Sequence, residues 1–80
     1  MREQIREILA ANGRLSVDVS AIAYDDDLYE AGLTSLITVN LLLAIEDHFD
    51  LEFPDELLSR RTFQSIDALA DAVASLQADV

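Results

Sequence analysis

Hydrophobic residues recur at helical spacing in the first part of the chain. The pattern predicts an amphipathic helix over residues 2–12, whose apolar positions are Ile5, Ile8 and Leu9. Gly13 follows, and glycine is typical of the position just after a helix. Residues 14–34 have no sustained period, so we expect a long loop whose scattered apolar residues anchor it to the helices. These anchors are Leu15, Val17, Val19, Ile22 and Leu28.

The longest predicted helix runs from Ser35 to Phe49, and two separate apolar stripes lie along it. At about 100° per residue, one stripe falls within an arc of about 80° and is expected to face the core. Its members are Thr38, Leu41, Leu42, Ile45 and Phe49. The second stripe is centred about 130° away and consists of Leu36, Val39 and Leu43. A small protein can hardly bury every face of such a helix. The second stripe is therefore either covered by the preceding loop or exposed as a docking surface.

The remaining pattern predicts a break, a short helix and a last long helix. The break falls at Asp50–Pro54, because proline disfavours helix in the residue before it. Its apolar residues, Leu51 and Phe53, are expected to point inward. Residues 55–60 can form a short helix that buries Leu57 and Leu58. The last helix is expected to start from a cap at Thr62 or Ser65 and to continue to about Gln77. Its apolar face consists of Phe63, Ile66, Leu69, Val73 and Leu76.

These elements predict an all-α fold with three longer helices and one short one, in a single domain spanning residues 1–80. A hydrophobic fraction of 51% is too high for a disordered chain. No cysteine is present, which excludes a disulfide scaffold and a thiolate metal site. No segment approaches the roughly 20 apolar residues that span a bilayer, and the N-terminus lacks the apolar core of a signal peptide. We expect a cytoplasmic monomer.

The charge of the chain narrows the choice of partners. Sixteen acidic residues against five basic ones give a net charge of −11, and lysine is absent. Such a chain repels nucleic acid and anionic membranes, and it should attract basic protein surfaces. The acids gather in two clusters around the long helix. They are Asp25, Asp26, Asp27 and Glu30, and then Glu46, Asp47, Asp50, Glu52, Asp55 and Glu56.

Ser35 is the most informative polar residue, because it stands at the junction between the long loop and the longest helix. A serine oxygen at a helix start can accept a hydrogen bond from a free backbone N–H, and the hydroxyl points out of the fold. A serine hydrolase needs a general base within hydrogen-bond reach. The only histidine, His48, lies thirteen residues along the same helix, or about 20 Å away if the helix is continuous. We predict that Ser35 is modified by another enzyme and that the chain has no catalytic residue.

The acidic residues allow two other interpretations, a calcium site and an acidic interaction module. Asp25–Asp27 does not begin an EF-hand loop, because no register places glycine sixth and glutamate twelfth. We therefore predict no specific metal site, although crowded carboxylates can bind divalent ions weakly. The alternative function is an acidic interaction module, such as an inhibitor that mimics nucleic acid. That function needs the charge but not Ser35.

The segment from Leu28 to Leu58 resembles the acyl carrier protein family, as do the helix lengths, the long first loop and the acidity. The matching motif positions are Gly32, Leu33, Ser35, Leu36, Glu46, Phe49, Pro54 and Asp55. The resemblance implies a four-helix bundle in which the serine matching Ser35 carries 4′-phosphopantetheine, transferred from coenzyme A by a phosphopantetheinyl transferase. It further implies that the thiol of this arm carries an acyl, aminoacyl or peptidyl group as a thioester.

Two departures from the family pattern point to a specialised carrier. Fatty-acid carriers usually have aspartate before the serine, where this chain has Thr34, and acids early in the following helix, where it has Ile37 and Asn40. The chain is similar to small stand-alone carriers loaded by aminoacyl-tRNA-synthetase-like ligases. The expected partners are an acyl- or aminoacyl-loading ligase and downstream transferases with basic docking surfaces. The residues expected to meet them are Leu36, Val39, Leu43, Glu46 and Asp47.

Overall fold

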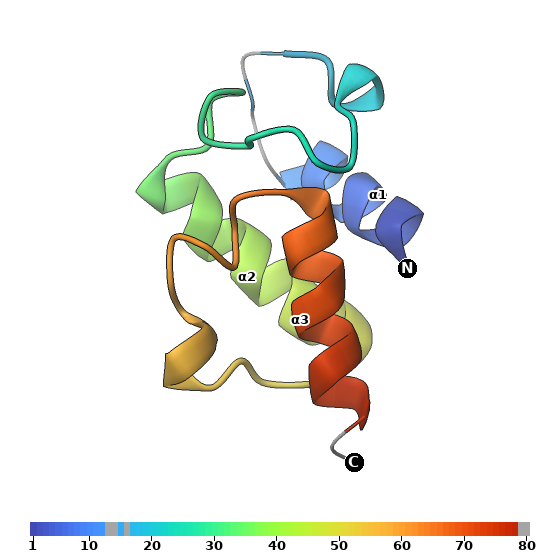
Figure 1. Ribbon diagram of the computed structural model, residues 1–80, viewed down its shortest axis with the longest axis vertical. Coiled ribbons are helices and arrows are strands. Elements are labelled where there is room, and N and C mark those ends of the chain that lie inside the picture. The colour runs from blue at the N-terminus through green and yellow to red at the C-terminus, as the bar shows by residue number, and fades with distance from the viewer. Residues whose placement is uncertain (13–14, 16, 79–80) are drawn as a thin grey trace.

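Three α-helices form the framework of the computed structural model, which describes residues 1–12, 15 and 17–78 (Figure 1). They are α1 (Arg2–Asn12), α2 (Ser35–Phe49) and α3 (Ile66–Ala78), and two short 3-10 helices, η1 (Val19–Ala21) and η2 (Asp55–Leu57), lie in the connections. Helix α1 packs against both α2 and α3. Regular structure in the described ranges is entirely helical, which confirms the all-α fold and its three longer helices. No helix among the described residues is long and apolar enough to cross a membrane.

Side-chain and backbone caps explain where the helices begin and end. The Ser65 hydroxyl accepts a hydrogen bond from the Ala68 amide at 3.0 Å, so Ser65 rather than Thr62 caps α3. Helix α2 ends at Phe49, and the next residue, Asp50, adopts the left-handed conformation with φ of 53°. Aspartate tolerates this conformation better than most residues. The Asp50 amide donates to the Glu46 carbonyl, which closes the last turn.

The long first loop is held to the helices by buried residues and by one arginine. Of its predicted anchors, Leu28 and Ile22 are 0% and 4% exposed, whereas Val17 is 46% exposed and was wrongly predicted. The Arg6 guanidinium on α1 donates to the carbonyl oxygens of Val19 and Ile22, both at 2.7 Å. This non-local contact supplies a constraint that periodicity does not indicate. The expected helix stop at Gly13 lies outside the described residues.

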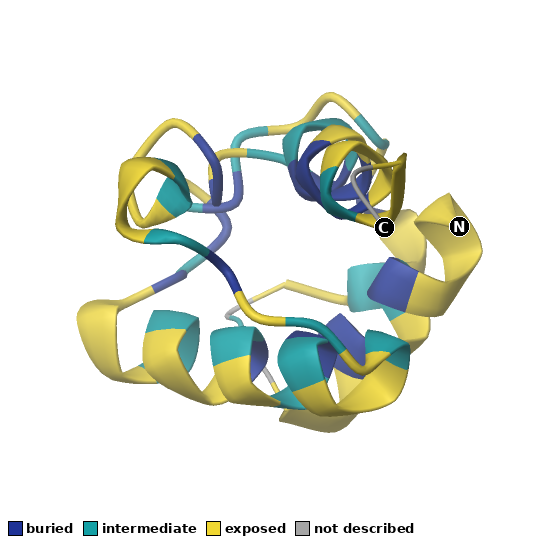
Figure 2. Ribbon diagram, turned by 90° about the horizontal axis from the view of Figure 1, so that it is seen from below, coloured by how far each residue is buried: buried dark blue, intermediate teal, exposed yellow. Residues whose placement is uncertain are grey.

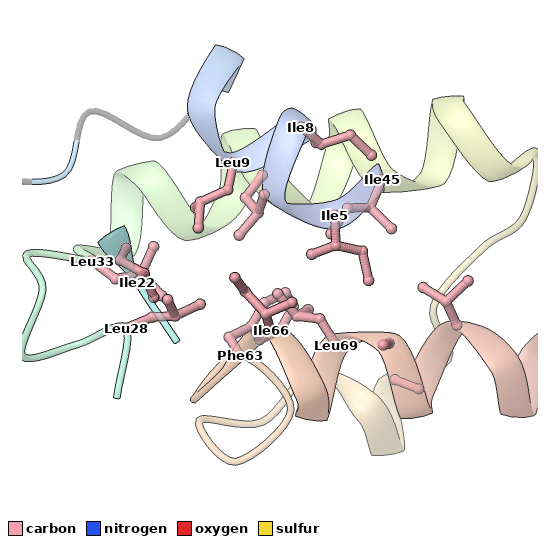
Figure 3. Close-up of a cluster of buried hydrophobic side chains, with 14 of the residues drawn as sticks. Ile5, Ile8, Leu9, Ile22, Leu28, Leu33, Ile45, Phe63, Ile66 and Leu69 are labelled. Atoms are coloured by element: carbon pink, nitrogen blue, oxygen red, sulfur yellow. The ribbon is translucent and has the colours of Figure 1, made fainter. Parts of the chain in front are cut away.

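The core forms where side chains from α1, the first loop, α2 and the start of α3 converge (Figure 3). Its largest fully buried members are Ile5, Leu9, Leu28, Leu41, Ile45, Ile66, Leu69 and Val73. Each such side chain contributes about 1.5–3 kcal/mol by leaving water. Loop residues and helix residues therefore belong to one core, which fixes the loop that leads into α2.

The connection between α2 and α3 differs from the prediction. The short helix covers only Asp55–Leu57, and Pro54 at its start makes no capping hydrogen bond through its side chain. Leu58 leaves the helical conformation with ψ of 60° and is 46% exposed, so its predicted burial is wrong. Phe63 lies in the turn before α3 rather than on that helix, yet it is buried beside Phe53 with ring centroids 6.2 Å apart.

Candidate functional site

A tight turn over residues 28–33 leads directly into α2. The Leu33 amide donates to the Leu28 carbonyl at 3.0 Å, and both side chains are buried. Gly32 has φ of 112°, a backbone conformation that glycine adopts without a steric penalty. The Leu28 amide also donates to the carbonyl of Gln64, just before α3, at 2.7 Å. The start of α2 is therefore positioned by the core and not by a loose loop.

Thr34, not Ser35, supplies the hydrogen bond that caps α2. The Thr34 hydroxyl oxygen accepts from the Ile37 amide at 3.2 Å, and the Thr34 carbonyl accepts from the Thr38 hydroxyl at 2.7 Å. Ser35 is the first residue of the helix and is exposed. Its hydroxyl makes no hydrogen bond with any residue in the part of the chain that the structure describes. The expectation that the Ser35 oxygen caps the helix is wrong, and the hydroxyl stays available.

Ser35 opens onto a cleft of about 550 Å³ between α2 and the segment that precedes α3. Its lining consists of Tyr29, Leu33, Thr34, Ser35, Thr38, Val39, Leu42, Leu58, Ser59, Arg60 and Phe63. The Tyr29 hydroxyl donates to the Arg60 carbonyl at 2.9 Å, and the Arg60 guanidinium lies 3.8 Å from the centre of the Tyr29 ring. Burial raises the pKa of the Tyr29 hydroxyl, and the positive charge of Arg60 opposes that rise.

The second apolar stripe of α2 lies on the surface. Leu36, Val39 and Leu43 are 72%, 51% and 58% exposed, so the first loop does not cover them. Figure 2 shows exposed residues along the outward side of the helix, with buried and intermediate residues on the side that faces the rest of the molecule. Asp47 is also exposed, whereas the Glu46 carboxylate accepts a hydrogen bond from the Phe53 amide at 2.8 Å. Glu46 thus has a structural role that sequence reasoning missed.

The remaining polar candidates do not assemble a reactive centre around Ser35. Helix α2 is continuous from Ser35 to Phe49, so His48 is about 20 Å from Ser35, and these two residues cannot form a dyad. The carboxylates of Asp26 and Asp27 accept hydrogen bonds from the amides of Ala23 and Tyr29 and thereby shape the loop. Among the described residues, no group of three or more histidine and carboxylate side chains could hold a metal ion.

Sequence reasoning missed two side chains that line the same cleft as Ser35. Tyr29 and Arg60 are 31 residues apart in sequence, and no periodic pattern relates them. The available signal was the Arg60–Arg61 pair, which stands out as the only adjacent basic residues in an acidic chain. Taken together, an exposed hydroxyl without an internal hydrogen bond and a cleft beside it fit the attachment of a prosthetic group such as 4′-phosphopantetheine.

Comparison with known proteins identifies the family. Residues 3–73 match the family described as a phosphopantetheine attachment site. The aminoacyl carrier protein of Agrobacterium fabrum (strain C58) is 53% identical over 73 residues, which cover 91% of this chain and 88% of that protein. The structure is similar to the crystal structure of an engineered Bradyrhizobium japonicum glycine:[carrier protein] ligase complexed with a carrier protein from Agrobacterium tumefaciens and AMP. That match has a TM-score of 0.89 and 53% identity and covers 92% of this chain and 99% of the other.

A more distant solved structure extends the comparison. It is the crystal structure of the Bradyrhizobium japonicum glycine:[carrier protein] ligase complexed with glycylated carrier protein. The match has a TM-score of 0.76 and 27% identity and covers 89% of this chain and 95% of the other. The family match spans most of the chain, and the fold agrees with that of carrier proteins. The chain therefore belongs to the acyl carrier protein family, whose prosthetic group is covalently attached 4′-phosphopantetheine.

Proposed function

We propose that Ser35 is the attachment point of 4′-phosphopantetheine. The observation that supports this proposal is the state of the Ser35 side chain. Ser35 is the first residue of α2 and borders the cleft, and its exposed hydroxyl makes no hydrogen bond with any described residue. Ser35 also lies inside the range matched to the family, residues 3–73. The Thr34 hydroxyl oxygen already accepts the capping hydrogen bond from the Ile37 amide, so modification of Ser35 removes no capping hydrogen bond. When bound, the prosthetic group supplies a thiol that carries acyl or aminoacyl cargo as a thioester.

The chain is proposed to act as a carrier and not as an enzyme. A serine hydroxyl is a weak nucleophile unless a base lies within hydrogen-bond reach. Ser35 has no such partner among the described residues, and His48 stands near the far end of α2. Activation of the hydroxyl must therefore come from the phosphopantetheinyl transferase. The proposed unit is a single carrier domain over residues 1–80, and its expected cytoplasmic location remains a prediction.

We infer that the cargo is an amino acid, with glycine as the first candidate. The relative with 53% identity is named an aminoacyl carrier protein, and the similar solved structures pair carrier proteins with a glycine:[carrier protein] ligase. The neutral Ile37 and Asn40 in the first turns of α2 also separate this chain from the fatty-acid pattern. An acidic module without a prosthetic group is not favoured, because residues 3–73 match a family described as a phosphopantetheine attachment site.

We propose that the docking surface for the ligase is the exposed stripe of Leu36, Val39 and Leu43 together with Asp47. The stripe begins one residue after Ser35, so a bound enzyme reaches the attachment point and the apolar anchors at once. A few well-packed residues near the centre of an interface contribute most of its binding energy, and we expect the apolar stripe to supply them. Asp47 and Glu46 lie near the opposite end of α2, where they would attract a basic surface and orient the encounter.

A loading assay tests the cargo. The holo protein is incubated with a glycine:[carrier protein] ligase, ATP and one amino acid at a time, and the product is followed by intact mass before and after hydroxylamine treatment. We expect a mass gain of one glycyl group that hydroxylamine removes, and no gain for Ser35→Ala. A parallel reaction with a fatty-acyl loading enzyme serves as the comparison. Efficient fatty-acyl loading without aminoacyl loading would overturn the assignment of the cargo.

A further inference from the structure

The four arginines that the structure describes differ in their partners. Arg2 pairs with Asp67 at 2.5 Å, and Arg6 pairs with Glu3 at 3.0 Å. Arg60 and Arg61 have no carboxylate partner among the described residues. This is unexpected in a chain with sixteen acidic residues. Guanidinium groups carry five N–H donors, so an arginine without a carboxylate leaves strong donors open to another anion.

Arg60 is held in place although it is exposed. Its guanidinium stacks over the Tyr29 ring at 3.8 Å from the ring centre, and the Tyr29 hydroxyl donates to the Arg60 carbonyl at 2.9 Å. One contact holds the side chain of Arg60 and the other holds its backbone carbonyl. Stacking covers one face of the planar guanidinium but leaves the N–H groups at its edge free to donate. Arg60 is thus a positioned cation, whereas no contact of this kind with a described residue fixes the neighbouring Arg61.

The cleft that Arg60 lines is the one that Ser35 borders. Among the eleven described residues that line this cleft, Arg60 carries the only formal charge. The lining of the cleft beside Ser35 thus carries one positive and no negative side chain, in a protein whose net charge is −11. The stack on Tyr29 holds the cation of Arg60 at the lining of the cleft that Ser35 borders.

We propose that Arg60 is a positioning residue for the prosthetic arm, whose phosphodiester it holds through charge-assisted hydrogen bonds. This inference rests on the proposed attachment at Ser35. Attachment through the Ser35 oxygen places an anionic phosphodiester, with its two non-bridging oxygens, directly at the border of the cleft. The planar N–H edge of arginine matches such an oxygen pair better than the point charge of lysine does. Arg60 thereby limits the directions in which the base of the arm can point.

Nuclear magnetic resonance of the free carrier tests this role without any partner enzyme. Wild type, Arg60→Gln, Arg60→Lys and the matched control Arg61→Gln are prepared in apo and holo form, and intact mass establishes that each holo sample carries one arm. We expect the Arg60 Nε–Hε resonance to move between apo and holo wild type several times more than that of Arg61. The phosphorus resonance should shift in Arg60→Gln, shift less in Arg60→Lys and stay unchanged in Arg61→Gln.

The possible failures are distinguishable. Absence of the arm at Ser35 would overturn the proposed function and this inference with it. A correctly attached arm with identical Arg60 resonances in apo and holo wild type would overturn the inference alone, and this comparison needs no variant. Equal phosphorus shifts in Arg60→Gln and Arg61→Gln would also overturn it, because only the net charge would then matter. Loss of ligase binding in Arg60→Gln would assign Arg60 to the enzyme interface instead, if the phosphorus resonance is unchanged in that variant and the Arg60 Nε–Hε resonance is the same in apo and holo wild type.

Discussion

Thr34 and Ser35 are adjacent, yet they have different roles at the start of α2. The Thr34 hydroxyl oxygen accepts a hydrogen bond from the Ile37 amide, which is one of the N–H groups that have no partner within the helix at its start. Because that need is met one residue earlier, the Ser35 hydroxyl can be modified without loss of a helix cap. The arrangement also explains why threonine at this position is compatible with a carrier, although the family pattern described for fatty-acid carriers has aspartate.

The two residues should respond differently to alanine. Thr34→Ala should lower the free energy of unfolding by about 1 kcal/mol, because it removes the cap. Ser35→Ala should stay within about 0.5 kcal/mol of wild type, since it removes no internal bond and alanine is a better helix former. Urea unfolding followed by circular dichroism measures both. A loss of stability in Ser35→Ala as large as that in Thr34→Ala would contradict the assignment of the cap.

At the scale of the element, α2 presents a core face and a surface face. Leu41 and Ile45 are fully buried, whereas Leu43 lies between them in sequence and is 58% exposed. The helix therefore joins the core and the proposed enzyme surface through one rigid element. This gives a matched pair of substitutions on the same helix with opposite expected effects.

Ile45→Ala should lower the free energy of unfolding by about 2–5 kcal/mol, through lost burial and the cavity that remains. Leu43→Ala should change it by no more than about 0.5 kcal/mol, because it alters only the surface. Phe49→Ala should fall at the lower end of the core range, since Phe49 is only half-buried. Denaturant midpoints measure all three variants. Equal losses for Ile45→Ala and Leu43→Ala would show that the faces of α2 are wrongly assigned.

The exposed face of α2 can be tested separately by binding. Val39→Ala and Leu43→Ala should each weaken binding of the loading ligase by about 1 kcal/mol or more. Asp47→Asn should mainly lower the association rate and its dependence on salt. Glu46→Gln would change stability as well as charge, because the Glu46 carboxylate also accepts a hydrogen bond from the Phe53 amide. If both apolar variants bind the ligase as wild type does and are equally stable, the docking surface does not lie on this face of α2.

The sequence predicted the long helices well because their apolar periods are regular and local. The bounds of α1 and α2 agree with the prediction, and α3 ends one residue later than expected. The connections were predicted less well, because non-local contacts fix them. Nothing near Leu58 in sequence indicates its exposure, and the stack of Arg60 on Tyr29 joins two loops. The start of α2 at Ser35 was predictable from the sequence, but the residue whose side chain accepts from the Ile37 amide was not.

At the scale of the whole molecule, charge repulsion is the main unfavourable feature. The net charge is −11, and the ion pairs among the described residues are Arg2–Asp67 and Arg6–Glu3. Both pairs involve α1, so the acids of the loop before α2 and those at the end of α2 form no ion pair with any described residue. Crowded like charges destabilise the compact state, and salt screens them.

Added sodium chloride or millimolar magnesium should therefore raise the melting temperature of the chain. Asp25→Asn should raise it at low salt and should reduce the response to added salt, because Asp25 is an exposed acid of the first cluster. Thermal unfolding by circular dichroism over a series of salt concentrations is the measurement. A melting temperature that is flat or falls over low to moderate salt would count against the repulsion argument.

The central claim is that Ser35 carries the prosthetic group, and intact mass with fragment mapping tests it most directly. The apo protein is incubated with coenzyme A and a phosphopantetheinyl transferase, alongside Ser35→Ala and the control Ser59→Ala, which removes the other serine hydroxyl of the cleft. We predict one added 4′-phosphopantetheine in wild type and in Ser59→Ala, mapped to Ser35, and none in Ser35→Ala. Full loading of Ser35→Ala, or a loaded fragment that lacks Ser35, would contradict the account.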